Sequence, residues 1–552
     1  MNKKQHISEL VATLKAKGIA GVVLAPGSRN APLTQVFYRE LPEMCVNLVD
    51  ERSAGYFALG IAMKQQMPAV VCTTSGTAVL NLAPAVAEAY HQHIPLIVLT
   101  ADRPKEWLGQ HDNQTINQTA IFGSNCKGSF ELPVQMQSTD DLWYANRIIN
   151  EAYNLAIAGT PGPVHINIPL KEPLYEKLPI AQEVRTISTI SSEAFIFPKT
   201  LKLDWKEYEN VMVVCGQMSP DNRLEILLNK FSEKTRIPVL AESIANIKGE
   251  TIIQNADLIL TQSDAPEVPQ LVIYFGGQVV SKRLKLYLRS SKNTVVWYIS
   301  EDGQHIDTFQ HLTHVINCSP ACFFEAFLKE DFEEKNNNYQ KSWLKYKHRI
   351  LEKIGGLKPK ISYSDLWAHA QISESLTKDD ILFAGNSSVV RYLQFFKSDI
   401  KNIYSNRGTS GIDGCVSTAA GIASQTNKKV LVVVGDLSFM YDSNGLWNRN
   451  LPENLKVVVI NNGGGSIFGM ISGPSEQPSY KDFFEANHPV LLDKVAEAFQ
   501  VEYFISIRKE SFVDLYKQFY SSSKAALLEI VTNNEDNASV FHNFIENIRS
   551  NE

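Results

Sequence analysis

The sequence of 552 residues contains little cysteine, no long apolar run and no excess of charge of one sign. Its seven cysteines are scattered, only Cys318 and Cys322 lie close together, and no CxxC pairs recur. This usage favours reduced, mostly buried thiols in a cytosolic protein over a disulfide framework. No apolar run approaches the roughly 18–20 residues that a membrane-spanning helix needs. A net charge of −6 gives no reason to expect nucleic acid or an anionic membrane as a partner.

What the sequence does contain is the composition of a globular protein, with 44% hydrophobic and 20% charged residues. The length indicates about three or four domains. Strand-like and helix-like segments alternate in three regions, which predicts the α/β class with parallel sheets. We expect domains over residues 1–180, 195–340 and 360–552, with an extended linker at 176–195. The stretch MNKKQHISELVATL lacks the apolar core of a signal peptide, so we expect a first surface helix there.

Apolar, β-branched runs mark the expected strands. In the first region these are residues 21–25, 45–49, 69–73, 96–100 and 164–168. In the second they are 211–215, 238–241, 258–261, 271–275 and 294–299, and in the third 381–384, 403–405, 430–434, 457–460 and 526–531. The second region shows few candidate catalytic groups and no glycine-rich nucleotide fingerprint, so we interpret it as mainly structural.

Two neighbouring strand-like runs end on side chains that carry oxygen. VLVVVGDLSFMYD places Asp436 after one strand, and KVVVINNGGGSIF places Asn462 after the next, with about one crossover helix, at 443–449, between them. Because the carboxyl ends of parallel strands meet at one sheet edge, these oxygens should converge there. Mg²⁺ prefers such ligands together with phosphate oxygens, and Ser438 or the helix start near Ser443 can receive a phosphate. The chain has no GxxxxGK[ST], and GxGxxG fails from Gly463.

This pair of motifs resembles the signature of the thiamine-diphosphate-dependent enzymes. The resemblance implies three doubly wound parallel-sheet domains, thiamine diphosphate with Mg²⁺ or Mn²⁺, and metal ligands from Asp436, Asn462 and the carbonyl of Gly464. It also implies that Glu51, which opens the helix after the strand MCVNLV, is the catalytic glutamate that holds N1′ of the cofactor. The architecture implies a homodimer, or a dimer of dimers, with active sites between subunits. Further cofactor contacts carried over by motif are Pro26, Thr74, Ser387, Ile412 (the wedge that bends the cofactor), Gly435, Ser438, Phe439, Ile467 and Phe468.

Four arginines lie at or near the carboxyl ends of expected strands, where ligands bind. Arg29 and Arg103 belong to the first region, and Arg391 and Arg407 belong to the third. An arginine matches a carboxylate bidentately and stays charged at any working pH. Each of them alone reads as a surface or salt-bridge residue. Together they indicate substrates with several carboxylates.

At this point the sequence resembles a family of menaquinone-pathway synthases. The motifs that carry the resemblance are PGSRNAPL, DERSAGYFALG, TSGTAVLNLAPAVAEA, LTADRP, GNSSVVR, SNRGTSGIDG, GDLSFMYDSNGL and NNGGGSIF. The family decarboxylates 2-oxoglutarate and adds the resulting succinyl semialdehyde carbanion equivalent in 1,4 fashion to isochorismate, with release of CO₂ and retention of the enolpyruvyl group. The resemblance covers the first and third regions densely and the central one thinly, chiefly through FGGQVVSKRL.

The same motifs imply the substrate contacts. These are Ser387, Arg391 and Arg407 for carboxylates near the thiazolium, Arg29, Arg103 and Lys282 on the isochorismate side, Asn113 and Gln114 near the reacting centre, and Ile467 and Phe468 as pocket walls. Lys282 is open to exchange with Arg283 or Lys285, because a shifted register would place either of them there.

Two other functions remain as alternatives. A carboligase or oxidase that acts on pyruvate, with flavin in the central region, would share the metal motif, and a binding protein with a relic fold would share the domains. His91 and His93 lack a third zinc ligand nearby in the sequence, and His165 lies in an apolar strand as a core histidine would. The sequence leaves open dimer against tetramer and any regulation by a downstream metabolite.

Overall fold

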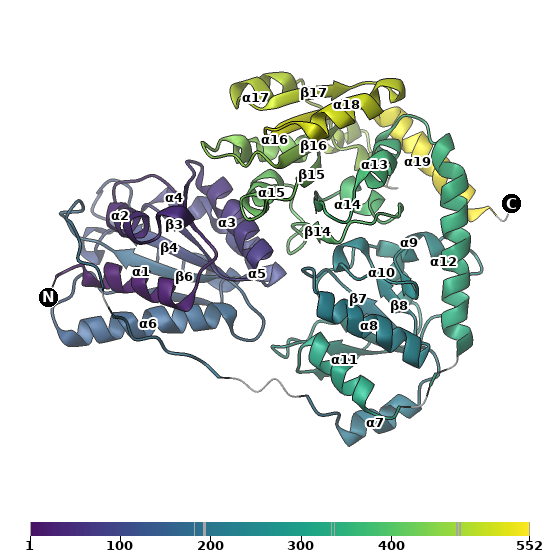
Figure 1. The fold of residues 1–552 in the computed structure, drawn as a ribbon, viewed down its shortest axis with the longest axis horizontal. Helices are drawn as coiled ribbons and strands as arrows, with labels where there is room; N and C mark the ends of the chain where they lie inside the picture. The colour runs from purple at the N-terminus through teal and green to yellow at the C-terminus, as the bar shows by residue number, and fades with distance from the viewer. Residues whose placement is uncertain are drawn as a thin grey trace.

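The protein folds into three domains, each built on a six-stranded sheet in which all strand pairs are parallel. This computed structural model describes residues 2–181, 183–190, 195–332, 334–335, 337–470, 473 and 476–550. In Figure 1 the first domain lies on the left, the central domain at the lower right and the third domain at the upper right. The predicted α/β class with three parallel-sheet domains is therefore confirmed.

The first sheet has the strand order β2-β1-β3-β4-β6-β5. Its strands are β1 (Val22–Leu24), β2 (Cys45–Asn47), β3 (Ala69–Thr73), β4 (Leu96–Asp102), β5 (Gly128–Glu131) and β6 (Val164–Pro169), and its helices are α1 (Gln5–Lys17), α2 (Ala31–Glu40), α3 (Glu51–Gln65), α4 (Thr77–Asn81), α5 (Ala83–Gln92) and α6 (Thr139–Ile157). Strand β5 was not expected, because its sequence GSFE is polar and only half-buried at the sheet edge. Helix α1 was expected at the surface, but eight of its thirteen residues are buried.

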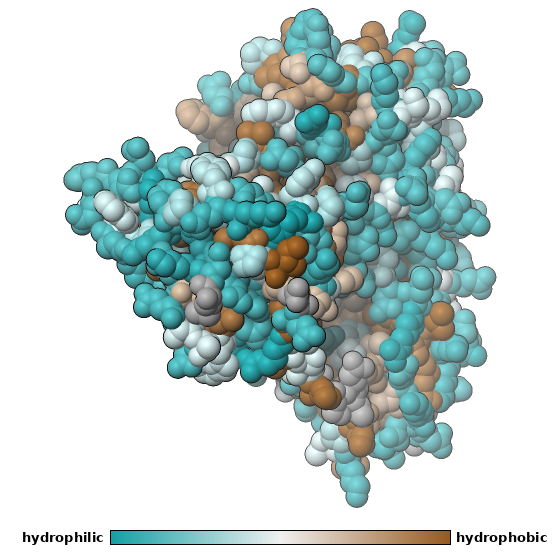
Figure 2. Space-filling view, turned by 60° about the vertical axis from the view of Figure 1, so that its left-hand side comes forward, coloured by the Kyte–Doolittle hydropathy of each residue, from teal (hydrophilic) through white to brown (hydrophobic). Residues whose placement is uncertain are grey.

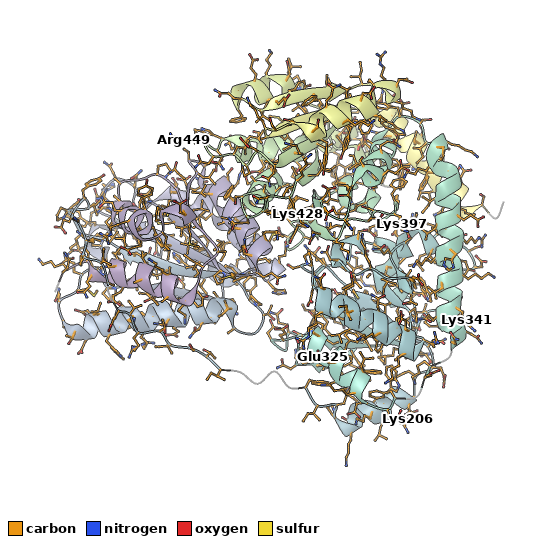
Figure 3. The ribbon with its side chains drawn as sticks, in the orientation of Figure 1. Lys206, Glu325, Lys341, Lys397, Lys428 and Arg449 are labelled. Atoms are coloured by element: carbon orange, nitrogen blue, oxygen red, sulfur yellow. The ribbon has the colours of Figure 1, made fainter. Side chains whose placement is uncertain are left out.

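The central sheet has the order β12-β11-β10-β7-β8-β9. Its strands are β7 (Val211–Cys215), β8 (Val239–Ala241), β9 (Ile252–Ile253), β10 (Leu271–Phe275), β11 (Val295–Ile299) and β12 (Leu312–Ile316), with helices α7 (Lys199–Lys206), α8 (Asn222–Thr235), α9 (Ala256–Ile259), α10 (Lys282–Arg289) and α11 (Pro320–Lys329). An ion pair of 2.7 Å joins Arg223 of α8 to Glu325 of α11. Figure 3 labels Glu325. The strand expected at 258–261 is wrong, because the chain forms helix α9 there; a short apolar run fits a buried helix as well as a strand.

The third sheet has the order β14-β13-β15-β16-β18-β17. Its strands are β13 (Ile381–Ala384), β14 (Asn402–Tyr404), β15 (Val430–Gly435), β16 (Leu455–Asn461), β17 (Glu502–Ser506) and β18 (Ala526–Val531), and its helices are α12 (Asn337–Leu357), α13 (Asp365–Ser375), α14 (Ser388–Tyr392), α15 (Cys415–Ala423), α16 (Asp436–Tyr441), α17 (Leu492–Ala498), α18 (Lys509–Ser521) and α19 (Asn534–Arg549). The helix expected at 443–449 is wrong. The α-helix begins at Asp436, and a 3-10 turn follows at Ser443–Leu446.

The domains pack on one another through shared apolar cores. Helix α3 of the first domain lies against α15 of the third, side by side in Figure 1, and glycines allow this close approach. A Cβ at Gly60 would lie 2.0 Å from the carbonyl oxygen of Thr418, and one at Gly421 would lie 2.1 Å from that of Phe57. The long helix α12 runs beside both the central and the third domain.

The polarity of the surface and the burial of the cysteines are typical of a globular protein. The face in Figure 2 is mostly hydrophilic, with apolar side chains in scattered patches. Cys72, Cys215 and Cys415 are buried, and the other four cysteines are half-buried, so fewer are buried than expected. Among the helices of the described residues, none combines the length and the apolar character that crossing a membrane requires. The expected linker includes residues 182 and 191–194, which lie outside the described residues.

Candidate functional site

The side chains that follow β15 and β16 lie at one edge of the third sheet. The two strands are parallel neighbours, and their register pairs Gly435 with Ile460. Asp436 is the first residue of α16, and Asn462 directly follows β16. The convergence that the strand ends predicted is therefore present in the fold.

Asp436 is a buried carboxylate with an oxygen that lacks a hydrogen bond. The residue is 1% exposed, and its Oδ1 accepts a 2.7 Å hydrogen bond from the N–H of Leu437. Its Oδ2 has no hydrogen bond of normal geometry among the described residues, and Nε2 of His488 lies 3.3 Å from it. Burial raises the pKa of Asp436, against the N–H of Leu437 and the His488 imidazole. Such an oxygen suits a hard divalent cation.

Asn462 is held by a carboxylate that sequence reasoning missed. Its amide Nδ2 donates to Oδ2 of Asp365 at 2.8 Å and to Oγ of Ser466 at 3.0 Å. Its Oδ1 is then directed toward the glycine loop, where the N–H of Gly464 donates to it at 3.3 Å. Asp365 also accepts a 2.6 Å hydrogen bond from Thr532. From the sequence, Asp365 is only the first residue of a helix after Ser364, so no local signal identified this orienting role.

The loop after β16 requires glycine. Gly463 has φ of 82° and Gly464 has φ of 154°, and both values lie in the region that side chains disfavour. A Cβ at Gly464 would also lie 2.3 Å from the carbonyl oxygen of Glu485. The N–H of Gly465 donates to that same carbonyl at 2.5 Å. The segment that carries Glu485 therefore covers this loop closely.

Partly exposed apolar side chains lie around the same edge. Ile412 is 38% exposed, and its carbonyl accepts a 2.6 Å hydrogen bond from Oγ of Ser438 in α16. Phe468 is 36% exposed and Ile467 is half-buried. The side chain of Phe439 is fully buried in the core.

Arg391 and Arg407 both bond to the segment that follows β13. Nη1 of Arg391 donates to the carbonyl of Ser387 at 2.8 Å, and Nη1 of Arg407 donates to Oδ1 of Asn386 at 3.1 Å. Ser387 has φ of 68°, an uncommon conformation for serine that concentrates at functional sites. Burial and the nearby charge of Arg391 lower the pKa of Arg407.

The loop that carries Arg407 is anchored by the first domain. Buried Glu88 of α5 accepts hydrogen bonds from the N–H of Gly408 at 2.7 Å, and from the N–H and hydroxyl of Thr409 at 2.7 and 2.6 Å. Burial raises the pKa of Glu88, and these donors oppose that rise. Sequence reasoning missed Glu88, whose only signal is a charged residue on an otherwise apolar helix face.

The basic residues at the start of α10 differ in their surroundings. Lys282 is exposed at the start of α10. Arg283 forms an ion pair of 2.6 Å with Asp257. Lys285 is half-buried and feels the charges of Arg407 and Arg391. Asp257, the partner of Arg283, also raises the pKa of Arg391, against the effect of burial, so this end of α10 lies near the arginine pair.

The second pair of arginines lies at the edge of the first sheet. Arg29 is 5% exposed, and its guanidinium contacts the carbonyl of Leu170 at 3.0 Å and Oε1 of Glu172 at 3.3 Å. Arg103 pairs with Asp112 at 3.0 Å, and it donates to the carbonyl of Asn113 at 3.1 Å. Burial first, and then the charge of Arg103, lower the pKa of Arg29. The exposed side chains of Asn113 and Gln114 belong to the same loop.

Thr74 and Pro26 lie side by side at this edge. Thr74 follows β3 and is 6% exposed, and its hydroxyl has no hydrogen-bond partner among the described residues. Pro26 follows β1 closely and is exposed. A Cβ at Gly27 would lie 2.3 Å from Cβ of Thr74, so the loop after β1 rests on Thr74.

Glu51 opens α3, as predicted, at the boundary between two domains. Its Oε2 accepts a 3.2 Å hydrogen bond from Nδ2 of Asn81. The preceding Asp50 caps the helix and accepts a 2.8 Å hydrogen bond from Asn444 of the third domain. Among the described residues, no hydrogen bond or ion pair connects Glu51 with Asp436 or Asn462 in this single chain.

The predicted residues thus form separate groups within one chain. No cluster of three or more His, Cys, Asp or Glu suited to a metal ion occurs among the described residues, so a metal at Asp436 would depend on amide and backbone oxygens. His165 is fully buried and hydrogen-bonded to Thr100 at 2.7 Å and to Ser129 at 3.1 Å, which confirms it as a core histidine.

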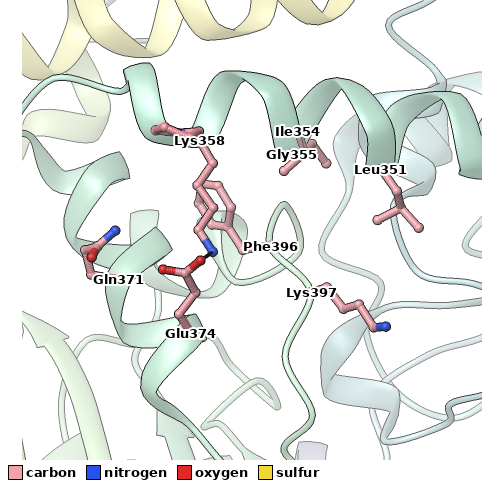
Figure 4. A pocket seen from close by; sticks show the side chains of 9 residues that line it. Leu351, Ile354, Gly355, Lys358, Gln371, Glu374, Phe396 and Lys397 are labelled. Carbon is pink, nitrogen blue, oxygen red and sulfur yellow. Dashed lines mark ion pairs between the residues drawn. The ribbon is translucent and has the colours of Figure 1, made fainter.

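A cavity of about 660 Å³ lies away from these groups, between α12 and the third domain (Figure 4). Lys358 and Glu374 form an ion pair of 2.5 Å across it, and Phe396 forms part of its wall. None of its lining residues was predicted to bind a ligand.

Three family models match the chain in the order of its domains. Residues 7–121 match the thiamine pyrophosphate enzyme N-terminal TPP binding domain, residues 187–384 match the middle domain of thiamine pyrophosphate enzymes, and residues 384–530 match the C-terminal TPP binding domain. Together with the fold and the strand-end site, these matches define a thiamine pyrophosphate enzyme.

Curated relatives narrow this class. The chain is 39% identical over 531 residues to a protein of Desulfotalea psychrophila, covering 91% of this chain and 94% of the relative. It is 37% identical over 566 residues to one of Bacteroides thetaiotaomicron and 35% identical over 564 residues to one of Cytophaga hutchinsonii, covering 99% of each chain. Each relative is named 2-succinyl-5-enolpyruvyl-6-hydroxy-3-cyclohexene-1-carboxylate synthase. The chain belongs to this synthase family.

Proposed function

We propose that the protein is a transferase of menaquinone biosynthesis that decarboxylates 2-oxoglutarate and adds the four-carbon remainder to isochorismate. The proposal depends on one observation. The oxygen-bearing residues Asp436 and Asn462, which follow β15 and β16, lie at the same sheet edge as two arginines that follow β13 and β14. Both substrates carry two carboxylates. Pyruvate carries one and would leave part of this positive charge without a partner.

The residues at the edge of the third sheet fit a divalent cation and a diphosphate. Asp436 offers a buried oxygen without a hydrogen bond of normal geometry, Asn462 is oriented by Asp365, and the glycine conformations around Gly464 bring backbone carbonyls close. We assign the metal, Mg²⁺ or Mn²⁺, to these three residues. Ser438 and the N-terminus of α16 lie beside them for the phosphates.

Each remaining group has a role in the chemistry. Thiamine diphosphate, when bound, supplies the nucleophilic carbon and the electron sink. Glu51 would hold a proton at N1′ of the aminopyrimidine, and Ile412 would support the bound cofactor. Arg391 and Arg407 orient the carboxylates of the oxo acid at the reacting centre. The apolar side chains of Ile467 and Phe468 exclude water from it.

The first domain supplies the second substrate site. Burial and the charge of Arg103 lower the pKa of Arg29, and a bound dianion would oppose the effect of that charge. Asn113 and Gln114 lie exposed on the loop that Arg103 contacts, where their amides can donate hydrogen bonds. We assign isochorismate to this edge.

A second copy of the chain would complete the site. Glu51 makes no contact with the metal edge of its own chain, and exposed apolar side chains surround it: Val49 at 41%, Leu80 at 47% and Tyr441 at 53%. Covering this patch with another subunit would bury apolar area and bring a carboxylate to a metal edge. We therefore propose a homodimer, or a dimer of dimers, and a cytoplasmic location suited to its reduced thiols.

Release of CO₂ from 2-oxoglutarate in the presence of isochorismate tests the function. We expect release to require thiamine diphosphate and Mg²⁺, and to stop when a chelator removes the metal. Faster turnover of pyruvate than of 2-oxoglutarate, or a yellow protein with bound flavin, would contradict the proposal and favour a pyruvate carboligase or oxidase.

A further inference from the structure

Strand β18 carries a glutamate in an otherwise apolar run. The strand reads ALLEIV, and Glu529 is 6% exposed within it. Burial of a carboxylate costs free energy that only well-placed partners offset, so its contacts indicate why the fold retains it. Both oxygens of Glu529 accept hydrogen bonds, and the donors lie on the neighbouring strands β16 and β17.

Glu529 holds the first asparagine of the loop that follows β16. Nδ2 of Asn461 donates to Oε1 of Glu529 at 2.6 Å, and the hydroxyl of Tyr503 donates to Oε2 at 2.5 Å. The other amide atom of Asn461, Oδ1, accepts a 3.0 Å hydrogen bond from the N–H of Gly463. These two contacts allow one amide orientation, because a carboxylate needs a donor and an N–H needs an acceptor. Glu529 therefore fixes Asn461, and Asn461 fixes the first turn of the glycine loop.

The next residue repeats this arrangement on the other face of the sheet. Asn462 donates to Asp365 and accepts from the same glycine loop. Residues two apart in a strand share a face, so Glu529 lies on the face of Leu527, which packs in the core shared with the first domain. Leu366, next to Asp365, packs in the core shared with the central domain. Two carboxylates on opposite faces thus hold the two asparagines.

Thr532 joins the two sides. Its N–H donates to the carbonyl of Asn461 at 2.8 Å, and its hydroxyl donates to Asp365 at 2.6 Å. The two carboxylates nevertheless have different tasks. Asp365 orients a side-chain oxygen, whereas Glu529 fixes the backbone turn that leads to Gly464.

We propose that Glu529 is a positioning residue for the divalent cation. Through Asn461 it holds the turn that presents the carbonyl of Gly464, and it thereby sets how tightly the site binds Mg²⁺. That carbonyl accepts one hydrogen bond, from the N–H of Ser466 at 3.2 Å, and keeps a second lone pair for a metal. The proposal rests on the metal site of the proposed function, but it does not depend on which substrates the enzyme uses.

Binding of thiamine diphosphate at different Mg²⁺ concentrations tests this role. Calorimetry on the full chain gives the Mg²⁺ concentration that half-saturates cofactor binding. We expect Glu529→Ala to raise this concentration about 10- to 100-fold, the range typical for loss of a residue that orients a metal ligand. Glu529→Gln keeps an acceptor for Asn461 and turns its own N–H toward the oxygen of Tyr503. This variant should therefore stay within about threefold of the wild type.

Reversal of the hydrogen bond provides a second test. Asn461→Asp places a second carboxylate against Glu529 and should raise the Mg²⁺ requirement about as much as Glu529→Ala, because like charges then face each other. The double variant with Asn461→Asp and Glu529→Gln again pairs a donor with an acceptor. Its Mg²⁺ requirement should return to within about threefold of the wild type. This comparison keeps the test decisive even where Glu529→Ala fails to fold.

Asp380→Ala is the matched control for stability. Asp380 directly precedes β13, is 7% exposed and, like Glu529, accepts a hydrogen bond from a tyrosine hydroxyl, that of Tyr520. The unfolding temperature of the cofactor-free chain should fall for Asp380→Ala and Glu529→Ala alike, but only Glu529→Ala should change the Mg²⁺ requirement. Three results would overturn the proposal: a wild-type Mg²⁺ requirement in Glu529→Ala, an equal rise in Asp380→Ala, or no recovery in the double variant.

Rates of CO₂ release separate this proposal from the proposed function. If the function holds, excess Mg²⁺ should restore most of kcat in Glu529→Ala, with KM for 2-oxoglutarate within about twofold of the wild type. If the wild type binds the cofactor with Mg²⁺ but releases no CO₂ from the two substrates, the function fails, and the Mg²⁺ comparison still decides the role of Glu529. Cofactor binding that needs no divalent cation in the wild type would overturn both.

Discussion

The first and third domains have the same strand order and different chemistry at the strand ends. Numbered from its own first strand, each sheet reads 2-1-3-4-6-5. The third and fourth strands are central in both. In the first domain they are followed by Thr74 and Arg103, and in the third by Asp436 and Asn462. One topology therefore presents a cationic edge and an oxygen-rich edge.

This difference shows that topology fixes where a ligand binds and that side chains fix which ligand it is. The central domain makes the same point in another way. From β9 to β12 its order is 3-2-1-4-5-6, the order of dinucleotide-binding folds. Its sequence carries no glycine-rich fingerprint, and Gln278 links it to the loop of Arg407 through a 2.7 Å hydrogen bond to the carbonyl of Gly408.

The largest effect is expected in the first domain, from Glu51→Gln. Loss of a carboxyl group that shares a proton with the cofactor should lower kcat about 100- to 10,000-fold, while cofactor binding changes less. Rates of CO₂ release and calorimetry of thiamine diphosphate measure the two quantities. Glu43→Gln, an exposed acid in the same domain, is the control. Activity of Glu51→Gln within tenfold of the wild type would contradict the role.

Asp436→Ala tests the strand ends of the third domain. Removing the buried oxygen should weaken Mg²⁺-dependent binding of thiamine diphosphate about 100-fold, since a charged contact contributes up to about 3 kcal/mol. Without cofactor the variant should unfold at the same temperature or higher, because burying a carboxylate whose Oδ2 lacks a hydrogen bond of normal geometry destabilises the fold. Exposed Asp514→Ala should change neither property. Equal cofactor affinity in Asp436→Ala and wild type would remove the metal assignment.

A glycine substitution tests the contact that joins the two domains. Gly60→Ala places a methyl group 2.0 Å from the carbonyl of Thr418, so the free energy of unfolding should fall by about 1–3 kcal/mol. Gly355→Ala in α12 meets open space and should raise it by about 0.5–1 kcal/mol. Urea unfolding of both variants checks this. If the two variants had similar free energies of unfolding, the close contact between α3 and α15 would not contribute to stability.

The smallest effect concerns pH and Asp442, which follows α16. Burial raises the pKa of Asp442 to about 7, although it accepts hydrogen bonds from the N–H and hydroxyl of Ser417 at 2.7 Å each. A raised pKa in the folded state means that its stabilising contribution is complete below about pH 4 and is lost as the pH rises through 7. Asp442→Asn should therefore gain stability over the wild type by about 1 kcal/mol per pH unit between pH 5 and pH 7.

Thermal unfolding across pH measures this difference. Asp379→Asn, an exposed carboxylate of the third domain, should follow the wild type at every pH. Parallel curves for Asp442→Asn and the wild type would show that the buried carboxyl group does not set the pH response.

The sequence predicted the features that depend on short, local patterns. Strands such as β3, β7 and β18 are covered on both faces of their sheets and therefore have continuous runs of apolar residues. Their bounds were predicted correctly. Asp436, Glu51, Arg103 and Arg407 were placed correctly relative to strand ends for the same reason. Polar edge strand β5 and two-residue β9 gave no such pattern, and the four-residue helix α9 was mistaken for a strand.

The partners of the site residues could not be predicted in this way, because they come from distant parts of the chain. Asp365 orients Asn462 across 97 residues, and Glu88 holds Thr409 across 321.

By itself, the sequence determined the fold class, the strand ends and the kinds of side chain that follow them, since each is set by local periodicity and chain connectivity. Only the tertiary structure decided which oxygens lack a donor, which cations crowd together and which acids position them. Those properties depend on burial and on all the residues that surround a group in space, and these neighbours come from distant parts of the chain.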